Sequence, residues 1–217
     1  ESFIPAAEPV LPRQVAAFCE TFAPHGLRPA AIRPAYGLAE ATLLVTTGFE
    51  PDGPRLLAVD AVALEEGRAV PVSESASGSR TYVSNGAETD GQDVRIVDPQ
   101  TLQILPAGQV GEIWVGGDEI AWGYWGNEAA SAATFRAVPV GDVAEAVRGS
   151  QFLRTGDLGF LQDGHLYVTG RLKDMMILRG QCHYPNDLEA SLVGAHPAIV
   201  GGAAAAFAVE DARGREA

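Results

Sequence analysis

The chain opens with apolar residues at helical spacing. The positions i, i+3, i+4 and i+7 of one stripe are occupied by Val15, Phe18, Cys19 and Phe22. With Pro12 placed for a first helical turn, this pattern predicts a helix over 12–23. A short apolar segment over 30–34 then indicates a strand, and residues 38–45 have helical composition. Helix, strand and helix in this order favour an α/β unit.

The hydrophobic pattern of the sequence changes after residue 48, where short apolar runs alternate with turn residues. A hairpin is predicted over 55–72, followed by a Ser-rich loop over 73–85. Three further strands are expected over 94–97, 103–105 and 112–115. The turn Asp163-Gly164 predicts a second hairpin over 152–170. Short strands at this regular spacing suggest a small antiparallel barrel or sheet.

The remaining segments are mostly short. Helices are expected over 128–135 and, within a loop, over 142–147. A strand over 175–178 precedes a helix that begins at Pro185, a residue suited to a first helical position. An Ala-rich strand is predicted over 200–209.

Charge and composition exclude several classes of protein. Among 217 residues, 15 Lys and Arg stand against 28 Asp and Glu, so the net charge is −13. So acidic a chain is a poor general ligand for nucleic acid or an anionic membrane, although it can still bind a nucleotide through local geometry. No apolar run is long enough to cross a bilayer. Two cysteines without metal-like spacing indicate reduced thiols in a cytoplasmic protein. The first residues lack the pattern of a secretory signal, and the absence of an initial Met suggests that the chain begins inside a longer protein.

The segment Tyr36-Gly37-Leu38-Ala39-Glu40 combines residue types suited to holding a nucleotide. An aromatic ring can stack on a base, and a glycine permits a tight turn. A carboxylate inside a following helix can hold Mg²⁺ beside a phosphate. The alternative is that Tyr36 packs in the core and Glu40 is a surface charge.

Two later segments carry charged residues near strand ends. In Arg154-Thr155-Gly156-Asp157, the two carboxylate oxygens of the aspartate match the two adjacent hydroxyls of a ribose; a turn-capping role is the alternative. The polar segment Gly170-Arg171-Leu172-Lys173-Asp174 indicates either a hinge or an exposed linker. The glycines and aromatics of 111–115 and 123–125 are interpreted as structural.

Taken in this order, these segments resemble the motifs of the adenylate-forming superfamily, which includes acyl-CoA ligases, luciferases and peptide-synthetase adenylation domains. The resemblance covers nearly the whole chain. Residues 34–42 and 183–189 resemble the branch of fatty acyl-AMP ligases, and residues 51–90 stand where that branch carries an insertion. In the branch, this insertion is thought to restrain the small C-terminal domain and to disfavour release onto free CoA.

The resemblance implies an α/β fold in two parts. Residues 1–170 would be the C-terminal part of the large AMP-binding domain, an α/β unit plus a small antiparallel β-barrel. Residues 171–217 would be the hinge and the start of a mobile, small α+β C-terminal domain. The intact protein would use ATP and Mg²⁺ to activate a fatty acid as an acyl-adenylate. It would pass the acyl group to an acyl carrier protein or the carrier domain of a polyketide synthase.

The resemblance also implies roles for single residues. Nucleotide binding falls to Tyr36, Gly37, Ala39, Asp157 and Arg171. Within this set, Tyr36 would flank the adenine, and Asp157 would hold the ribose hydroxyls with help from Arg171.

Three further residues receive roles in catalysis and domain movement. Glu40 would coordinate Mg²⁺ and serve in catalysis. Lys173 would be the hinge about which the C-terminal domain swings. Gly180 would lie near the path of the acceptor.

Some features depart from the pattern of the superfamily. Ala39 stands where many members have a threonine, and Gln181-Cys182 replaces a usual Arg-Asn pair. The phosphate-binding loop would lie before Glu1 and the catalytic lysine after Ala217, so the isolated chain is expected to be inactive. A long-chain acyl-CoA ligase and a non-catalytic, partner-binding paralogue are the alternative interpretations.

Overall fold

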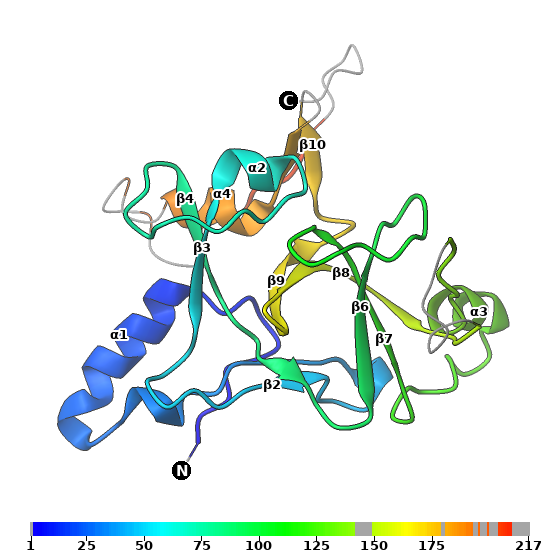
Figure 1. The fold of residues 1–217 in the computed structure, drawn as a ribbon, viewed down its shortest axis with the longest axis horizontal. Helices are drawn as coiled ribbons and strands as arrows, with labels where there is room; N and C mark the ends of the chain where they lie inside the picture. The colour runs from blue at the N-terminus through cyan, green and yellow to red at the C-terminus, as the bar shows by residue number, and fades with distance from the viewer. Residues whose placement is uncertain are drawn as a thin grey trace.

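The centre of the structure is an antiparallel sheet of four strands in the order β6-β7-β8-β9 (Figure 1). The strands are β6 (Gln92–Val97), β7 (Gly111–Gly117), β8 (Leu153–Gln162) and β9 (His165–Arg171). This computed structural model describes residues 2–141, 149–178, 181–192, 195, 199 and 204–209. The predicted hairpin over 152–170 is confirmed. Asp163 and Gly164 both have positive φ, 52° and 76°, as a two-residue turn between twisted strands requires.

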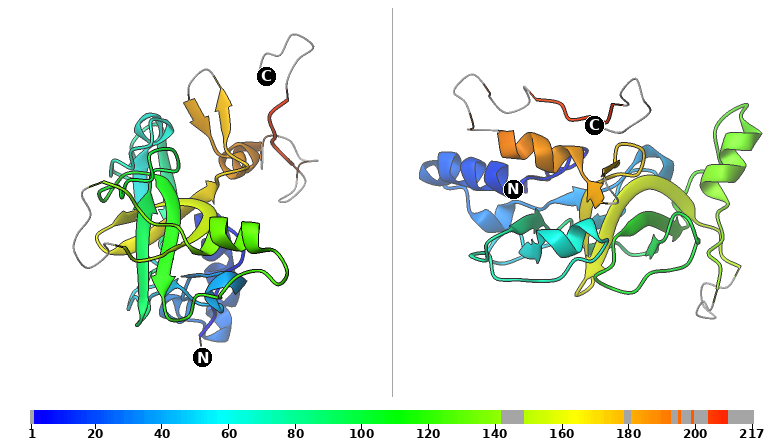
Figure 2. Two further views of the ribbon diagram at one scale, coloured as in Figure 1. Left: turned by 90° about the vertical axis from the view of Figure 1, so that its right-hand side faces the viewer. Right: turned by 90° about the horizontal axis from the view of Figure 1, so that it is seen from above.

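The sequence pattern suggested a small antiparallel barrel or sheet, and the structure has an open sheet with β6 and β9 at its edges. The barrel implied by the resemblance is therefore not confirmed. The sheet is nevertheless strongly curved, and β8 arches over it in Figure 2. At the β9 edge, the amide of Asn85 donates to Leu166 O and the amide of Leu166 donates to Gly86 O, both at 2.8 Å. A connecting segment therefore covers that edge.

The first helix, α1 (Pro12–Phe22), forms as predicted. The strand predicted over 30–34 is wrong, because Pro29–Ala31 is a short 3₁₀ helix. The strand instead comes slightly later, as β1 (Ala35–Tyr36), which pairs with β2 (Thr46–Thr47). Phe3, which precedes α1 in the chain, and Ile32, which follows it, form a single parallel β-bridge.

The helix predicted over 38–45 is also wrong. Only Ala39–Ala41 is helical, as one 3₁₀ turn, and Thr42 at φ +63° ends it. The chain then doubles back, so that the amide of Val45 donates to Tyr36 O at 2.9 Å. Pairing of β1 with β2 overrides the helical composition of this segment.

The segment from 51 to 90 is built differently from its prediction. Strand β3 (Leu56–Asp60) pairs with β4 (Ser79–Val83), inside the expected Ser-rich loop, and only one bridge joins Val59 to Pro71. Between them, Asp60 Oδ1 accepts a hydrogen bond from the amide of Ala63 at 2.8 Å and caps a short helix, α2 (Ala61–Glu65). This cap ends the strand where the sequence suggested a continuing hairpin.

The other elements mostly follow the sequence. Helix α3 (Glu128–Phe135) and helix α4 (Pro185–Leu192) form as expected, and β10 (Met176–Leu178) pairs with β11 (Gln181–His183). A third small sheet joins β1, β2 and β5 (Ala87–Glu88).

Three predictions for short segments end differently. The strand expected over 103–105 is reduced to isolated bridges. The part of 200–209 that the structure describes, residues 204–209, is not a strand. The helix expected over 142–147 lies outside the described residues. Within the described residues, no helix has the length and apolar character to span a membrane.

One hydrophobic cluster joins the 51–90 segment to the end of the chain. Its buried members are Val59, Leu64, Ala69, Tyr82, Leu158, Phe160, Tyr167 and Tyr184. Tyr184, which follows the predicted hinge, is only 2% exposed. The division at residue 170 stays a prediction, but the segment beyond it packs on residues 51–90 in this conformation.

Candidate functional site

A cavity of about 360 Å³ lies where the start of the chain meets β1, β8 and β9. Its walls are formed by Ala7, Glu8, Pro9, Ala35, Tyr36, Gly37, Leu38, Asn85, Asp157, Val168, Gly170, Arg171 and Asp174. Four of the five residues predicted to bind a nucleotide are therefore brought together: Tyr36, Gly37, Asp157 and Arg171. The volume lies in the range of small-molecule pockets.

Asp157 is the centre of a polar cluster in this cavity. The Tyr36 hydroxyl donates to Asp157 Oδ2 at 2.8 Å, and Arg171 Nε donates to Asp157 Oδ1 at 2.9 Å. A carboxylate offers about four lone-pair sites, so each oxygen keeps room for one further donor. Two vicinal hydroxyls are a donor pair that fits this remaining capacity.

The protonation states of the cluster follow from its geometry. Burial and the negative charge of Asp157 raise the pKa of Tyr36 well above 10.0, so the phenol stays a donor at neutral pH. The hydrogen bond and charge of Asp157 raise the pKa of Arg171 further, so the guanidinium stays charged. The cluster therefore holds one carboxylate between a neutral phenol and a cation.

A local irregularity of the sheet aims Asp157 at Tyr36. On β7, Glu112 pairs with Leu158 and Trp114 pairs with Arg154, so Ile113 alone lies opposite the three residues 155–157. The extra residues form a bulge in β8, a device that redirects side chains. We call residues 155–157 the β8 bulge.

Gly37 is required by close packing of the backbone. A Cβ at this position would lie 1.7 Å from Leu43 O and 3.1 Å from the Cα of Leu44. The reversal from β1 toward β2 therefore leaves no space for any side chain at Gly37. Its contribution to the cavity is this tight turn.

Ala39 and Glu40 do not line the cavity. Their 3₁₀ turn points toward the loop before α3, where the Tyr124 hydroxyl donates to Glu40 Oε1 at 2.9 Å and the amide of Ala121 donates to Glu40 O at 2.8 Å. Among the described residues, no hydrogen bond to the other carboxylate oxygen of Glu40 is found, so that oxygen can serve as a ligand.

The fit of Glu40 to Mg²⁺ can be judged from its surroundings. The described residues contain no group of three or more His, Cys, Asp or Glu side chains that could hold a metal ion. Mg²⁺ commonly takes one or two carboxylates and completes its shell with water and phosphate oxygens. A single carboxylate such as Glu40 fits that pattern, with phosphate supplied by a nucleotide.

Neither the predicted hinge residue, Lys173, nor the residue predicted to lie near the acceptor path, Gly180, is among the described residues that line the cavity. Lys173 is exposed and lies in a turn that the amides of Asp174 and Met175 close by donating to Arg171 O. It follows the cavity-lining Arg171 but does not line the cavity itself. Gly180 lies outside the described residues.

Sequence reasoning missed one wall of the cavity. Ala7, Glu8 and Pro9 line it, and Ala7 has a φ of +70°, which is uncommon for a residue other than glycine. Asn85 also lines it and donates from Nδ2 to Ala35 O at 3.1 Å, which fixes the start of β1. Strained backbone gathers at binding sites, but neither feature has a periodicity that reveals it in the sequence.

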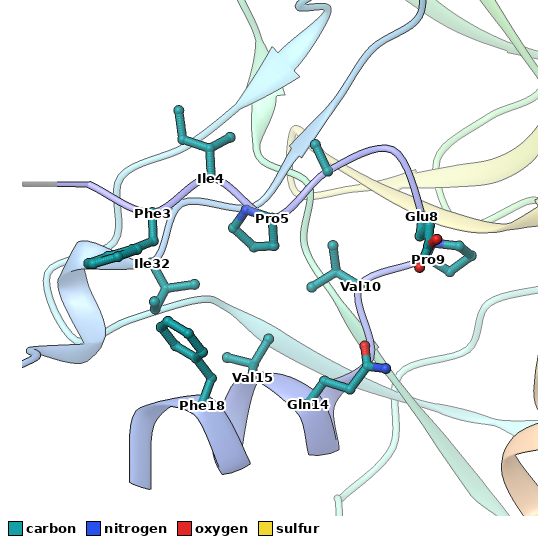
Figure 3. Close-up of a pocket in the computed structure, with 11 residues that line it drawn as sticks. Phe3, Ile4, Pro5, Glu8, Pro9, Val10, Gln14, Val15, Phe18 and Ile32 are labelled. Atoms are coloured by element: carbon teal, nitrogen blue, oxygen red, sulfur yellow. The ribbon is translucent and has the colours of Figure 1, made fainter. Parts of the chain in front are cut away.

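A second, mainly apolar cavity of about 430 Å³ adjoins the first (Figure 3). In Figure 3, Val15 and Phe18 rise from α1 toward Phe3 and Ile32. Glu8 and Pro9 are shared by both cavities, so the strained segment around them separates the polar cavity from the apolar one.

The fold and cavity define a mixed α/β protein with a polar cavity built around Asp157. Comparison with known proteins gives the family: residues 3–125 match the AMP-binding enzyme model, so the chain belongs to the family of AMP-binding enzymes.

Its relatives include fatty acyl-AMP ligases. The chain is 47% identical over 206 residues to the medium-chain-fatty-acid–[acyl-carrier-protein] ligase JamA of Moorena producens, covering 94% of this chain and 34% of JamA. It is 45% identical over 194 residues to the long-chain-fatty-acid–AMP ligase FadD26 of Mycobacterium tuberculosis, covering 89% and 32%. The chain thus spans about a third of the length of these relatives.

Solved structures support the same family. A structure from work on fatty acyl-adenylate ligases of Escherichia coli and Legionella pneumophila matches with a TM-score of 0.81 at 30% identity, over 99% of this chain and 36% of that chain. The Legionella fatty acyl-adenylate ligase in complex with acyl adenylate and pyrophosphate matches with a TM-score of 0.72 at 38% identity, over 97% and 36%. The expected mixed α/β fold of adenylate-forming enzymes is therefore confirmed.

Proposed function

We propose that the protein containing this chain uses ATP to activate a fatty acid as an acyl-adenylate and then transfers the acyl group to the thiol of a carrier protein. The observation that carries the proposal is the Tyr36–Asp157–Arg171 cluster in a cavity of nucleoside size. The names of the relatives support the substrate class, since one is a fatty acid–AMP ligase and another is an acyl-carrier-protein ligase.

Each residue of the cluster has a defined task in this proposal. Asp157 accepts hydrogen bonds from the two ribose hydroxyls, while Arg171 balances its charge and Tyr36 keeps it oriented beside the base. Fixing the ribose fixes the α-phosphate for in-line attack by a fatty acid carboxylate, because a positioned reactant reacts as in a unimolecular step. Glu40 would hold Mg²⁺, and the chemistry that the ion would supply when bound is stabilisation of negative charge on the nucleotide phosphates.

The test of this proposal is the variant Asp157→Asn in the full-length protein. Asn has the same shape but loses the charge and one acceptor, so hydrogen bonds to the ribose weaken. We expect kcat/KM for ATP to fall by about 10²-fold, mainly through KM, in fatty-acid-dependent ATP–pyrophosphate exchange, because hydrogen bonds to a charged group are the strong ones. Asp163→Asn, in the turn at the far end of the same hairpin, is the matched control and should leave the exchange unchanged. Equal kinetics of the two variants would contradict the role of Asp157.

We also propose that residues 51–90 hold the segment after the hinge. Glu65 Oε1 lies 3.2 Å from Arg80 Nη2 on β4 and 4.0 Å from His183 Nδ1 on β11. Burial and the negative charge of nearby Glu65 raise the pKa of the Cys182 thiol. The approach of Glu65 to His183 and the buried ring of Tyr184 support this attachment of the segment to residues 51–90.

Tyr184→Ala is expected to release this tie. Removal of a buried aromatic side chain costs about 3–5 kcal/mol, and here the loss falls on one docked segment. Limited proteolysis should therefore cut within 171–192 much faster than in the wild type, while β6–β9 stay protected. Leu192→Ala, at an exposed position on α4, is the control. If both variants resist cleavage as the wild type does, the tie does not depend on Tyr184.

A further inference from the structure

The carboxylate of Glu112 is buried beneath the β8 bulge, although the sequence suggested only a structural role for its segment. The residue is 2% exposed, and its charge is balanced by Arg154 at 2.7 Å. Burying an ion pair is seldom favourable for stability by itself, so a buried carboxylate calls for an account of what it holds in place.

Among the described residues this carboxylate accepts four hydrogen bonds, and three of them come from the β8 bulge or from Arg154 beside it. Oε2 accepts from Arg154 Nε at 3.0 Å, from Arg154 Nη2 at 2.7 Å and from Trp114 Nε1 at 2.9 Å. Oε1 accepts from the amide of Gly156 at 3.2 Å. The guanidinium of Arg154 also lies over the Trp114 ring, 5.5 Å from its centroid, which fixes both donors.

The Gly156 peptide is the link between this carboxylate and the candidate site. Gly156 has a φ of +71°, a left-handed conformation that glycine adopts without a Cβ clash, and both polar groups of its peptide are hydrogen-bonded. Its amide donates to Glu112, and its carbonyl accepts from the amide of Leu172 at 2.8 Å, next to Arg171.

Thr155 adds a second tie on the other side of the bulge. Its hydroxyl donates to Ile113 O at 2.7 Å and accepts from the amide of Asp157 at 3.1 Å. The bulge is therefore held at both ends, and the Glu112 contact is the charged one.

We propose that Glu112, charge-balanced by Arg154, is a positioning residue that holds the β8 bulge so that Asp157 meets the ribose hydroxyls. The inference rests on the proposed function, because it assigns Glu112 a part in nucleotide selection through Asp157. Glu112 itself does not line the cavity and touches no substrate. Its effect therefore falls on how well the site discriminates a ribose from a deoxyribose.

The experiment compares kcat/KM for ATP with kcat/KM for 2′-deoxy-ATP in pyrophosphate exchange by the full-length protein. The wild type is expected to prefer ATP, and Asp157→Asn is expected to lose the preference. In Glu112→Gln, the preference for ATP should fall by about tenfold, because Gln has a single acceptor oxygen and cannot serve both the Arg154 and Trp114 donors and the Gly156 amide. Arg154→Lys keeps the charge balance and should retain more of the preference.

A second variant separates positioning from stability. The double variant Glu112→Leu with Arg154→Met leaves no unpaired buried charge, so its melting temperature should stay close to that of the wild type. It also leaves the Gly156 amide without its acceptor, so the preference for ATP should still be reduced. A folded Glu112 variant with an unchanged preference overturns the inference. Failure of both variants to fold also overturns it, because Glu112 would then serve the sheet as a whole. A wild type without exchange, or without any preference for ATP, contradicts the proposed function itself.

Discussion

Glu40→Gln is expected to lower the turnover of ATP–pyrophosphate exchange by about 10²–10³-fold, the loss seen when one preorganised group that stabilises transition-state charge is removed. The Tyr124 hydroxyl donates a hydrogen bond to one carboxylate oxygen of Glu40, and the described residues provide no hydrogen bond to the other oxygen. Gln is similar in shape but is a neutral and much weaker ligand for Mg²⁺. The Mg²⁺ concentration that gives half-maximal turnover should therefore rise along with the loss of rate.

Tyr124→Phe is the matched comparison for this variant. The phenol donates to Glu40, and burial and Glu40 raise the pKa of Tyr124, so it remains a donor at neutral pH. Phe keeps the edge-on contact with Phe135, whose ring centroid lies 5.0 Å away, but leaves Glu40 unoriented. A loss of a few-fold is expected. Glu40→Gln with normal turnover and an unchanged Mg²⁺ dependence would show that Glu40 is a surface charge held by Tyr124.

The chemistry of the site was easier to predict from sequence than its backbone. Tyr36, Asp157 and Arg171 come from three separate segments, and the resemblance of these segments to one family is what groups them at the level of sequence. The helix predicted over 38–45 failed because composition does not register that Val45 bonds back to Tyr36. The hairpin predicted over 55–72 was wrong because an aspartate that caps a helix, as Asp60 does, looks the same in sequence as an aspartate in a turn.

Two parts of the site could not be predicted because they depend on contacts between distant residues. In the sequence, Glu112 is one polar position in a strand rich in glycine and aromatic residues. Only the register between β7 and β8 shows that its carboxylate lies beneath Gly156. Ala7 gives no signal at all, since a positive φ at alanine follows from the packing around it. Candidate site residues are thus identified from motifs in the sequence, whereas a residue proposed to position them appears only once the strands are paired.

The charge around the cavity leads to a second large expected effect. Among the residues that line it, Glu8, Asp157 and Asp174 are acidic, Arg171 is the one cation, and Arg171 is already paired with Asp157. An adenosine can bind in such a lining, but a triphosphate meets net negative charge. Nothing on this lining can offset the charge that develops on the α-phosphate during adenylation.

The isolated 217-residue chain should therefore show pyrophosphate exchange at least about 10²–10³-fold below that of the full-length protein. The affinity of the isolated chain for nucleotides should also fall with the number of phosphates, so that adenosine binds at least as well as AMP and ATP binds most weakly. These differences in affinity should shrink as salt screens the carboxylates. Asp157→Asn in the same chain should weaken the binding of adenosine most, because it removes hydrogen bonds to the ribose and also relieves repulsion of the phosphates, and this pattern ties the binding to this cavity. Circular dichroism establishes that both chains are folded before binding is measured by calorimetry. Exchange by the isolated chain at the rate of the full-length protein would show that the cavity already holds what catalysis needs, and the acidic lining would then have to be neutralised by the nucleotide's own Mg²⁺.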